Sequence, residues 1–327
     1  MEHWVEDLCE RALAGEMPAD DELLRLFSLE THSAEAAYVC WAAETIARRA
    51  SGNRAQVYAQ IGVDMLCCPM DCAFCTLARR NAPDCVLQSD PEALIVPTEE
   101  IVRYARVFDD AGVHLISLMA TAALPFERYL DIVQAVRAAV RDDQVIMVNA
   151  GDMSLEQAKR LKDAGAQMAY HAHRLGEGKI TRIPAETRLR TIANIREAGL
   201  GFMTAVEPVH AATTADHMLA RMHEAAGQHP YCSGVGSLHA VPGTAMADVK
   251  PVSKARLRLL ASIMRLLVGE DIPFGTGGGN VLWADAGTNP RGRDLSCDPD
   301  YLRRDVARLR RELQSMEWEV PARPIYR

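Results

Sequence analysis

The sequence of 327 residues predicts an α/β protein built as a (β/α) barrel of the TIM type, complete or nearly so, with an N-terminal helical extension. Short apolar runs alternate with longer amphipathic stretches at a spacing of roughly thirty residues, the period that parallel strands joined by helices require. An open doubly wound sheet gathers its ligands at one switch point, whereas a barrel places functional side chains at the carboxyl ends of many strands. We favour a barrel because polar residues recur near several strand ends, at Thr121, Asn149, His171, His173 and Glu207.

The chain begins with a segment of helical periodicity. Residues 20–29 and 33–51 both place apolar side chains at helical spacing, and Ser33 is the expected N-cap of the second helix. We therefore divide the chain into three parts, which are an N-terminal helical extension (1–52), the barrel (53–295) and a C-terminal helical tail (296–327).

Strands and helices alternate after this extension. The strands are expected at 56–63, 114–121, 144–151, 167–173, 201–209, 232–241 and within 273–287. The helices between them are expected at 98–112, with Thr98 as the cap, and at 126–141, 154–165, 184–199, 214–227 and 253–270. No helical pattern separates residues 273–278 from 280–287. Either the eighth strand follows a short loop, or the barrel is incomplete.

The composition favours small-molecule chemistry. Hydrophobic residues make up 49% of the chain and charged residues 24%, which is typical of a globular protein with a large core. The net charge of −8 argues against an electrostatic nucleic-acid binder, which needs clustered Lys and Arg. No signal-peptide pattern opens the sequence, and no run of roughly 18 apolar residues suits a membrane span. We therefore expect a cytoplasmic protein with neither a membrane nor a nucleic-acid partner.

Four of the nine cysteines fall within residues 67–75, "CCPMDCAFC". In a reducing compartment, clustered cysteines are metal ligands or redox thiols rather than disulfides. Cys68, Cys72 and Cys75 give the spacing C-x3-C-x2-C, and replacing Cys68 by Cys67 gives C-x4-C-x2-C, the spacing of plant-type [2Fe–2S] ferredoxins. Structural zinc would need further ligands nearby, for which Cys85 is the only candidate. Three thiolates on a four-iron cluster would leave one iron open to a small molecule.

The position of the triplet separates these interpretations. It follows the first strand of a β/α series, at the edge where barrel active sites lie. With Phe74 before its last cysteine, the stretch resembles the signature of radical S-adenosylmethionine (SAM) enzymes. The resemblance implies that Cys68, Cys72 and Cys75 bind a [4Fe–4S] cluster whose open iron binds SAM. It also implies that Phe74 belongs to the cofactor site and that SAM cleavage releases a 5′-deoxyadenosyl radical. Cys67 would then have no ligand role.

The resemblance extends to the group that holds biotin synthase, the [FeFe]-hydrogenase maturase, methylornithine synthase and the [Fe]-hydrogenase cofactor maturase. Residues 184–200 are similar to the segment of that group after the fourth strand, which implies that Arg188 grips the SAM carboxylate. Residues 241–246 resemble the end of its sixth strand. Biotin synthase holds a second, [2Fe–2S] cluster through cysteines on its barrel strands, and the matching strands here have none. We therefore do not expect biotin synthase activity.

Further candidates for the cofactor site lie at the strand ends. The second strand lacks the Gly-Gly-Glu that many radical SAM enzymes use for the SAM amino group, and Met119, Ala120 and Thr121 occupy its place. Backbone carbonyls or Thr121 would then have to bind that amino group. We include Asn149, at the end of the third strand, in the same set.

The catalytic candidates are His171, His173 and Glu207. Alternation along the fourth strand sends Tyr170 to one face and the two histidines to the other, where they would line the cavity as ribose contacts, acid/base groups or substrate ligands. Glu207 is a carboxylate in an otherwise apolar strand, and its burial without a partner would be costly. We expect it to contact SAM or the substrate, or else to form a structural salt bridge.

Other conspicuous residues support weaker hypotheses. Asp285, Asn289 and Arg291 are candidates for substrate contacts at the barrel mouth, and the isolated Cys232 and Cys297 are candidates for an accessory cluster. The stretch "GTGGG" at 275–279 lacks the Lys-Ser/Thr of a phosphate loop, so we interpret it as a tight turn.

We therefore expect a radical SAM enzyme that abstracts hydrogen from a small biosynthetic precursor in cofactor or amino-acid biosynthesis, similar to the [Fe]-hydrogenase cofactor maturase. It would take electrons from a donor such as flavodoxin or ferredoxin. A methylornithine-synthase-like mutase and a lipoyl-type sulfur-inserting enzyme are the alternatives among enzymes. From another class, a ferredoxin-like electron-transfer or scaffold protein would use Cys67 in place of Cys68.

Overall fold

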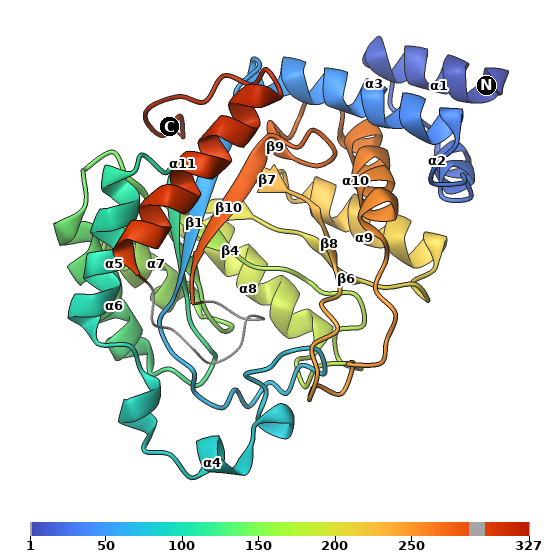
Figure 1. The fold of residues 1–327 in the computed structure, drawn as a ribbon. Helices are drawn as coiled ribbons and strands as arrows, with labels where there is room; N and C mark the ends of the chain where they lie inside the picture. Colours follow the sequence, from blue (N-terminus) through green and yellow to red (C-terminus); the bar gives the residue numbers. More distant parts are fainter. Residues whose placement is uncertain (1, 288–297, 327) are drawn as a thin grey trace.

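The structure, a computed structural model, describes residues 2–287 and 298–326. Its main element is an eight-stranded sheet in the order β10-β1-β2-β3-β4-β5-β7-β9, in which all paired strands are parallel. The sheet curls into a nearly closed barrel surrounded by helices (Figure 1), as the sequence predicts. Its strands are β1 (Gln56–Gly62), β2 (Leu115–Met119), β3 (Val145–Asn149), β4 (Met168–Tyr170), β5 (Gly201–Met203), β7 (Cys232–Ser233), β9 (Phe274–Gly275) and β10 (Val281–Ala286).

Helices form the outer layer and the N-terminal extension. The extension contains α1 (His3–Leu13), α2 (Asp20–Leu26) and α3 (Ala34–Ser51). The later long helices are α5 (Thr98–Asp110), α6 (Phe126–Ala139), α7 (Leu155–Asp163), α8 (Ala185–Glu197), α9 (Ala215–Gly227), α10 (Lys254–Val268) and α11 (Pro299–Ser315). Short elements η1 (Arg79–Asn81), α4 (Asp84–Leu87) and η2 (Pro91–Leu94) follow the cysteine-rich segment. None of these helices is both long and apolar enough to cross a lipid bilayer.

Local sequence signals fix several helix ends. The Ser33 side chain accepts a hydrogen bond from the Ala36 amide, which confirms the predicted cap of α3, and Gly52 ends that helix in the left-handed conformation. Ser154 and Gln157 form a reciprocal capping box at the start of α7. The predicted Thr98 cap is wrong, because Pro97 occupies the N-cap of α5 and Thr98 is its first helical residue. Proline pre-sets an extended backbone there and leaves no N–H unsatisfied.

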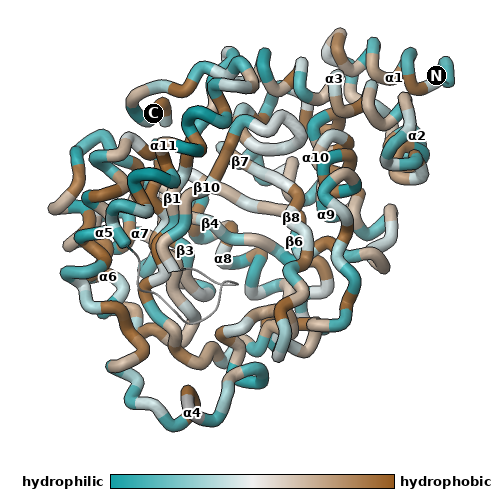
Figure 2. Tube along the Cα trace, viewed as in Figure 1, coloured by the Kyte–Doolittle hydropathy of each residue, from teal (hydrophilic) through white to brown (hydrophobic). Residues whose placement is uncertain are grey.

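Side chains along each strand alternate between two cores. Those inside the barrel come from almost every strand and make one cluster, Tyr58, Leu115, Val145, Met147, Met168, Met203, Cys232 and Phe274. The intervening residues, such as Val57, Ile116 and Ala169, pack outward against the helices in a larger cluster. Figure 2 shows hydrophobic residues along the central strands and alternating hydrophobic and hydrophilic residues along the surrounding helices. This alternation decides which strand-end residues face the barrel interior.

The last two units depart from regular barrel geometry. The predicted strand at 201–209 divides into β5 and β6 (Val206–Val209), and that at 232–241 divides into β7 and β8 (Val235–Ser237). The later halves pair with each other as a separate parallel sheet, with an irregular register. Pro208 in the first segment, and Gly234 and Gly236 in the second, are residues of the kinds that weaken or interrupt a strand. Both predicted strands therefore exist, but each changes its partner halfway.

The barrel has a seam between β9 and β10, where the described backbone has no strand pairing. The fully buried Asn280 bridges it, since its Oδ1 accepts from the Gly275 amide (2.9 Å) and its Nδ2 donates to the Pro273 carbonyl (3.0 Å). The Asn280 carbonyl accepts from the Gln56 amide of β1 (2.8 Å). The eighth strand thus follows a short loop, one of the two outcomes the sequence allows.

The two ends of the chain pack onto the barrel in different ways. Helices α1, α2 and α3 share a core with α9 and α10, and α11 packs against α5, β1 and β10. The segment after α11 crosses the amino-terminal end of the barrel, where Tyr326 stacks edge-on against Tyr231 and packs against the interior cluster together with Ile325. Figure 1 shows both termini at the end of the molecule opposite to α4 and the cysteine-rich segment.

Candidate active site

The cysteine-rich loop runs from the end of β1 to η1, at the carboxyl end of the barrel. Short backbone bonds fold it, from the Cys68 amide to the Leu77 carbonyl (2.8 Å) and from the Cys75 amide to the Cys72 carbonyl (3.0 Å). The Asn81 amide group donates to the Cys75 carbonyl (2.8 Å). These bonds bring Cys68, Cys72 and Cys75 to one side of a compact loop.

A second segment holds the cysteine loop against the barrel. The Ala73 amide donates to the Ile180 carbonyl (2.7 Å), and the Arg182 amide donates to the Met70 carbonyl (2.8 Å). The buried carboxylate of Asp71 accepts from the Arg80 amide (2.9 Å) and pairs with Arg182 (3.0 Å). The loop is therefore fastened to the chain that follows β4.

The thiols of Cys68, Cys72 and Cys75 share one electrostatic environment. Burial raises the pKa of all three, that of Cys72 to about 12. The charges of Cys75 and Cys68 raise the pKa of Cys72 further, and that of Cys68 raises the pKa of Cys75, while Arg174 lowers both. These effects place Cys68 and Cys75 near the Cys72 thiol. Soft thiolates in this number are suitable ligands for an iron–sulfur cluster.

The geometry differs from that of a site for a single metal ion. Within residues 2–287 and 298–326, no three His, Cys, Asp or Glu side chains are close enough to hold one ion. An iron–sulfur cluster takes its thiolates on different irons, so its ligands lie further apart than those of one zinc ion.

Arg188 lies in a buried charged network beside this loop. Its Nε donates to Glu177 Oε2 (3.2 Å), and its Nη1 lies 3.3 Å from Asp152 Oδ1 and 3.0 Å from His171 Nε2. Burial alone would raise the pKa of Asp152, but the hydrogen bond to His171 and the charge of Arg188 lower it. Two carboxylates therefore neutralise and orient the Arg188 guanidinium. Asp152 and Glu177 had no signal in the sequence, because neither lies on a strand or in a motif.

The expected orientation of the two histidines is wrong. Tyr170 packs against the barrel-interior cluster, and the alternation along β4 sends His171 to the outer side, where its Nε2 lies 2.9 Å from Asp152 Oδ1. His173 also lies outside, with its Nδ1 2.7 Å from Glu224 Oε1 and in contact with Arg221 of α9. Burial lowers the pKa of His171, so its ring is neutral at pH 7. The prediction took the inward and outward faces of β4 the wrong way round.

Thr121 joins the loops that follow β1 and β2. Its hydroxyl donates to Asp64 Oδ1 (2.7 Å), and its amide donates to Asp64 Oδ2 (2.8 Å). Burial raises the pKa of Asp64, although the bonds from Thr121 oppose this. The Met119 carbonyl accepts from the Val63 amide (2.9 Å). Thr121 and Met119 are thus at the predicted edge of the barrel, and both are already bonded to the chain next to the cysteine loop.

Glu207 lies at the barrel mouth with Tyr170 and Arg174. Its Oε1 accepts from the Tyr170 hydroxyl (2.8 Å) and lies 3.5 Å from Arg174 Nε. The Arg174 guanidinium also lies over the Phe74 ring, at 5.8 Å from its centroid, which links this group to the cysteine loop. Burial alone would lower the pKa of Arg174, but the charge of Glu207 raises it. Phe74 itself packs against buried Leu238 and Met246, the latter from the predicted sixth-strand ending.

Other side chains project into the barrel at and below its mouth. The register pairs Met119 with Asn149, so both face inward with Tyr170. Gln60 Nε2 donates to Asp285 Oδ2 (2.9 Å) across β1 and β10. Trp283 faces inward edge-on to Tyr58 and is still 36% exposed, so space remains beside its ring. Alternation in the sequence groups Gln60 with Tyr58 and Trp283 with Asp285, but the structure is needed to show that this face is inside.

The remaining cysteine and loop candidates differ in where they lie. Cys232 is buried in the interior cluster among apolar side chains, and burial raises its pKa to about 12. Asn289, Arg291 and Cys297 lie outside the described residues. Cys67 is half-buried.

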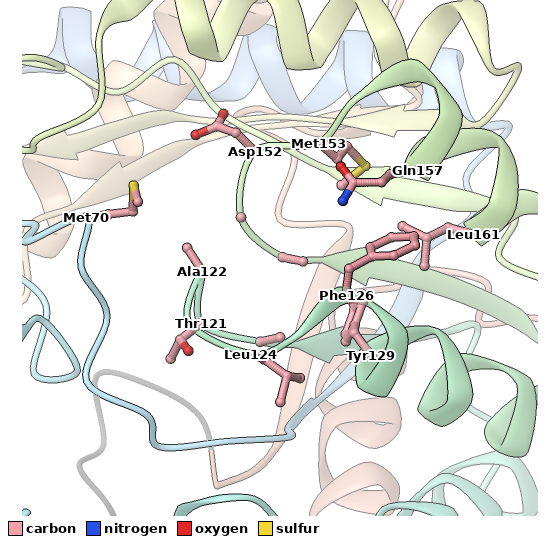
Figure 3. A pocket seen from close by; sticks show the side chains of 13 residues that line it. Met70, Thr121, Ala122, Leu124, Phe126, Tyr129, Asp152, Met153, Gln157 and Leu161 are labelled. Carbon is pink, nitrogen blue, oxygen red and sulfur yellow. The ribbon is translucent and has the colours of Figure 1, made fainter. Parts of the chain in front are cut away.

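A cavity of about 310 Å³ adjoins the cysteine loop at the ends of β2 and β3. Its wall comes mostly from apolar side chains of α6, α7 and the preceding loops, with Met70 at the rim and Asp152 as its carboxylate (Figure 3). Gly151 is required there, because a Cβ at that position would lie 2.8 Å from the Cβ of Ala122. The two strand-end loops therefore touch at the floor of this cavity.

Comparisons with known proteins find a family match and similar sequences. Residues 64–218 match the family model of the radical SAM superfamily. A biotin synthase of Synechococcus sp. (strain CC9605) is 27% identical over 243 residues, 70% of each chain. A biotin synthase of Prochlorococcus marinus (strain MIT 9303) is 25% identical over 296 residues, 80% of this chain and 85% of that protein.

Two solved structures share the fold. The crystal structure of methylornithine synthase (PylB) has a TM-score of 0.78 at 16% identity and covers 96% of this chain and 97% of its own. The [FeFe]-hydrogenase maturase HydG from Carboxydothermus hydrogenoformans has a TM-score of 0.76 at 15% identity, covering 97% and 79%.

The fold is a nearly closed (β/α) barrel, and the loop with the three thiols lies at the carboxyl end of its strands. The part of the chain that carries these thiols matches the radical SAM superfamily, and the relatives and the fold agree with this match. Enzymes of this superfamily use a [4Fe–4S] cluster and SAM, take small-molecule substrates and need an electron donor.

Proposed function

We propose that Cys68, Cys72 and Cys75 bind the [4Fe–4S] cluster of this enzyme and that Cys67 does not. The supporting observation is the compact fold of the loop, in which the Cys68 amide bonds to the Leu77 carbonyl and the Cys75 amide to the Cys72 carbonyl, with the charges of Cys68 and Cys75 both acting on the Cys72 thiol. When bound, such a cluster supplies the electron that cleaves SAM to methionine and a 5′-deoxyadenosyl radical. A barrel mouth suits this chemistry because it excludes water around the reacting groups.

The residues around the loop are then assigned to binding and orientation. Arg188 is proposed to hold the SAM carboxylate, since Asp152 and Glu177 fix its guanidinium while no described residue bonds its Nη2. Phe74, Met119, Thr121 and Asn149 form the surrounding wall. His171 acts through Asp152 and Arg188 as a positioning residue rather than through contact with the substrate. His173, bonded to Glu224 outside the barrel, is the least suited of the catalytic candidates.

For the reaction, we propose hydrogen abstraction from a small biosynthetic precursor, in the manner of the [Fe]-hydrogenase cofactor maturase, without sulfur insertion. Sulfur insertion of the biotin synthase kind needs a second cluster on barrel strands. The inward residues of β2 and β3 are Leu115, Ser117, Met119, Val145, Met147 and Asn149, which provide no thiol. Cys232 lies deep in an apolar layer.

Anaerobic reconstitution with iron and sulfide tests the assignment. We expect about four irons per chain, as one [4Fe–4S] cluster requires, and an EPR signal of the reduced cluster that shifts when SAM is added. About six irons per chain would indicate the second cluster of a biotin synthase instead. A cluster signal that SAM leaves unmoved, together with no 5′-deoxyadenosine after reduction by dithionite, would contradict the proposal.

Single cysteine replacements give the matched control. Cys68→Ala should lose most of the iron and the SAM-dependent shift, whereas Cys67→Ala, one residue away, should keep both. The reverse result would favour the ferredoxin-type spacing, in which Cys67 replaces Cys68.

A further inference from the structure

Two guanidiniums lie near the cysteine loop, the buried one of Arg188 and the partly buried one of Arg174, and they differ in how many of their donors the protein satisfies. Arg188 makes contacts with Glu177, Asp152 and His171, within 3.3 Å in each case. Arg174 follows β4 and has no side-chain hydrogen bond within the described part of the chain. Its buried Nε is unsatisfied, and its nearest anion, Glu207 Oε1, is 3.5 Å away.

The missing hydrogen bond of Arg174 has an energetic cost. A guanidinium offers five N–H donors in a fixed plane, and a buried donor left unpaired costs about 1–3 kcal/mol. Glu207 neutralises the charge of Arg174 but does not satisfy its donors, because the same Oε1 accepts the Tyr170 hydroxyl at 2.8 Å. The protein therefore holds a cation whose charge is balanced and whose buried Nε–H has no hydrogen-bond partner among the described residues.

The surroundings of Arg174 place it between the cysteine loop and the barrel interior. Its guanidinium lies over the ring of Phe74, which belongs to the cysteine loop, and Glu207 connects it to the inward-facing Tyr170. A ligand that reaches Arg174 therefore lies next to the thiols and above the interior of the barrel. A radical formed at the cluster would act on a substrate in this position.

We propose that Arg174 binds a carboxylate group of the substrate, with Glu207 and Tyr170 as the residues that position it. A planar carboxylate matches the guanidinium fork with two parallel hydrogen bonds. A phosphate would bring a second negative charge next to Glu207 and is disfavoured. The inference rests on the proposed function, because it takes Arg188 as the partner of SAM, and it assigns the substrate to the carboxylic acids.

The test uses the reconstituted, SAM-loaded and unreduced enzyme, so that no turnover occurs. Sodium propionate is the probe, since it is too small for shape to exclude it, and propionamide is its neutral counterpart. Binding is followed by saturation-transfer NMR. In Arg174→Gln we expect the propionate affinity to fall by about tenfold or more, while the SAM affinity stays within about twofold of the wild type. Arg174→Lys should recover part of the propionate binding, because it restores the charge without the fork.

Controls separate this inference from the cluster assignment. Arg79→Gln removes an exposed guanidinium from the same loop and should leave propionate binding unchanged. Iron content and circular dichroism of each variant report whether the site is still assembled. Failure of the wild-type protein to bind a cluster or SAM would count against the proposed function before any Arg174 variant is made.

Two results would overturn the inference itself. One is a propionate response that is the same in wild type and Arg174→Gln, including no response in either. The other is a loss of SAM affinity in Arg174→Gln with no selective loss of propionate, which would make SAM the anion that Arg174 holds.

Discussion

Arg265 is a buried arginine that bonds to the backbone of the last barrel unit. Its guanidinium is fully buried and donates to the carbonyls of Gly269 (2.9 Å), Ile272 (2.5 Å), Gly275 (3.3 Å) and Thr276 (3.0 Å). Burial lowers its pKa to about 10, which still leaves it charged at pH 7. It therefore organises the glycine-rich turn that the sequence predicts at 275–279.

Replacing Arg265 by Met should lower the free energy of unfolding by about 3 kcal/mol, because several buried carbonyls lose their donor at once. Urea unfolding of the cluster-free protein, followed by circular dichroism, measures this. Arg258→Met is the matched control on the same helix, where the side chain is 63% exposed, and it should change the free energy by less than about 0.5 kcal/mol. Equal effects of the two changes would contradict the role given to Arg265.

The sequence is most informative about those parts of the site whose residues lie within one short segment. The spacing of Cys68, Cys72 and Cys75 predicts a cluster loop because the proposed ligands belong to one short segment. Arg174 lies in the same segment as His171, just after the fourth strand. Its position in the site depends on Glu207 and Phe74, which come from distant segments of the chain. No spacing rule contains such distances, so side chains that meet only after folding could not be ranked in advance.

At the scale of elements, the seam between β9 and β10 rests on side-chain bonds rather than on a strand ladder. Asn280 uses both ends of its amide to hold Gly275 and Pro273, as an asparagine does when it replaces a missing backbone partner. Neighbouring strands of the barrel have regular parallel pairing, such as β1 with β2.

Replacing Asn280 by Ala should therefore loosen the barrel locally. We expect faster amide hydrogen exchange within residues 272–286, and a loss of about 2 kcal/mol in the free energy of unfolding from the unsatisfied Gly275 amide and Pro273 carbonyl. Hydrogen exchange read by mass spectrometry localises the effect. Asn194→Ala, which removes a single bond to the Met153 carbonyl on another side of the barrel, should leave exchange at 272–286 unchanged. Amide hydrogen exchange that becomes faster by the same factor across the whole molecule in the Asn280 variant would contradict a local effect at the seam.

The sequence predicts the positions of most helices and strands, but it predicts less about which strands pair with each other. Helices α5 to α10 and the first four strands appear within a few residues of their expected places, because amphipathic periodicity and caps are local properties. The division of residues 201–209 into β5 and β6 was not predicted, since it reflects a change of partner strand. The inward face of β4 was wrong for a related reason, because alternation gives two faces without saying which one is inside.

At the scale of the whole molecule, the C-terminal segment is tied to the first strand of the barrel. His114 is 1% exposed, its Nδ1 accepts from the Val57 amide of β1 (2.9 Å), and its Nε2 donates to the Pro321 carbonyl (2.9 Å). Burial lowers the pKa of His114 to about 4, although the bond to Pro321 opposes this. The neutral ring is thus part of the contact between the barrel and the chain end.

This contact predicts a pH-dependent stability. The unfolded chain protonates His114 near pH 6.5 and the folded protein only near pH 4, so the unfolded state binds more protons between these values. The stabilisation from the neutral His114 ring is fully present above about pH 6.5 and is lost as the pH falls toward about 4. The free energy of unfolding falls by about 3 kcal/mol in total over this range. Urea unfolding across this range should show a shallower slope for His114→Gln than for the wild type. The exposed His223→Gln serves as the control and should keep the wild-type slope; identical slopes for all three proteins would contradict the assignment.

The C-terminal segment also determines how the protein can be attached to a surface or a label. Tyr326 packs so tightly beneath the barrel that a Cβ on Gly201 would lie 2.1 Å from its hydroxyl, so residues fused directly after the chain end would compete for that space. The first helix instead lies on the outside of the extension, at the end of the molecule opposite to the cysteine loop (Figure 1). An affinity handle or electrode linker joined to the amino terminus therefore leaves the cysteine loop facing solution, which is the orientation that spectroscopy on immobilised enzyme requires.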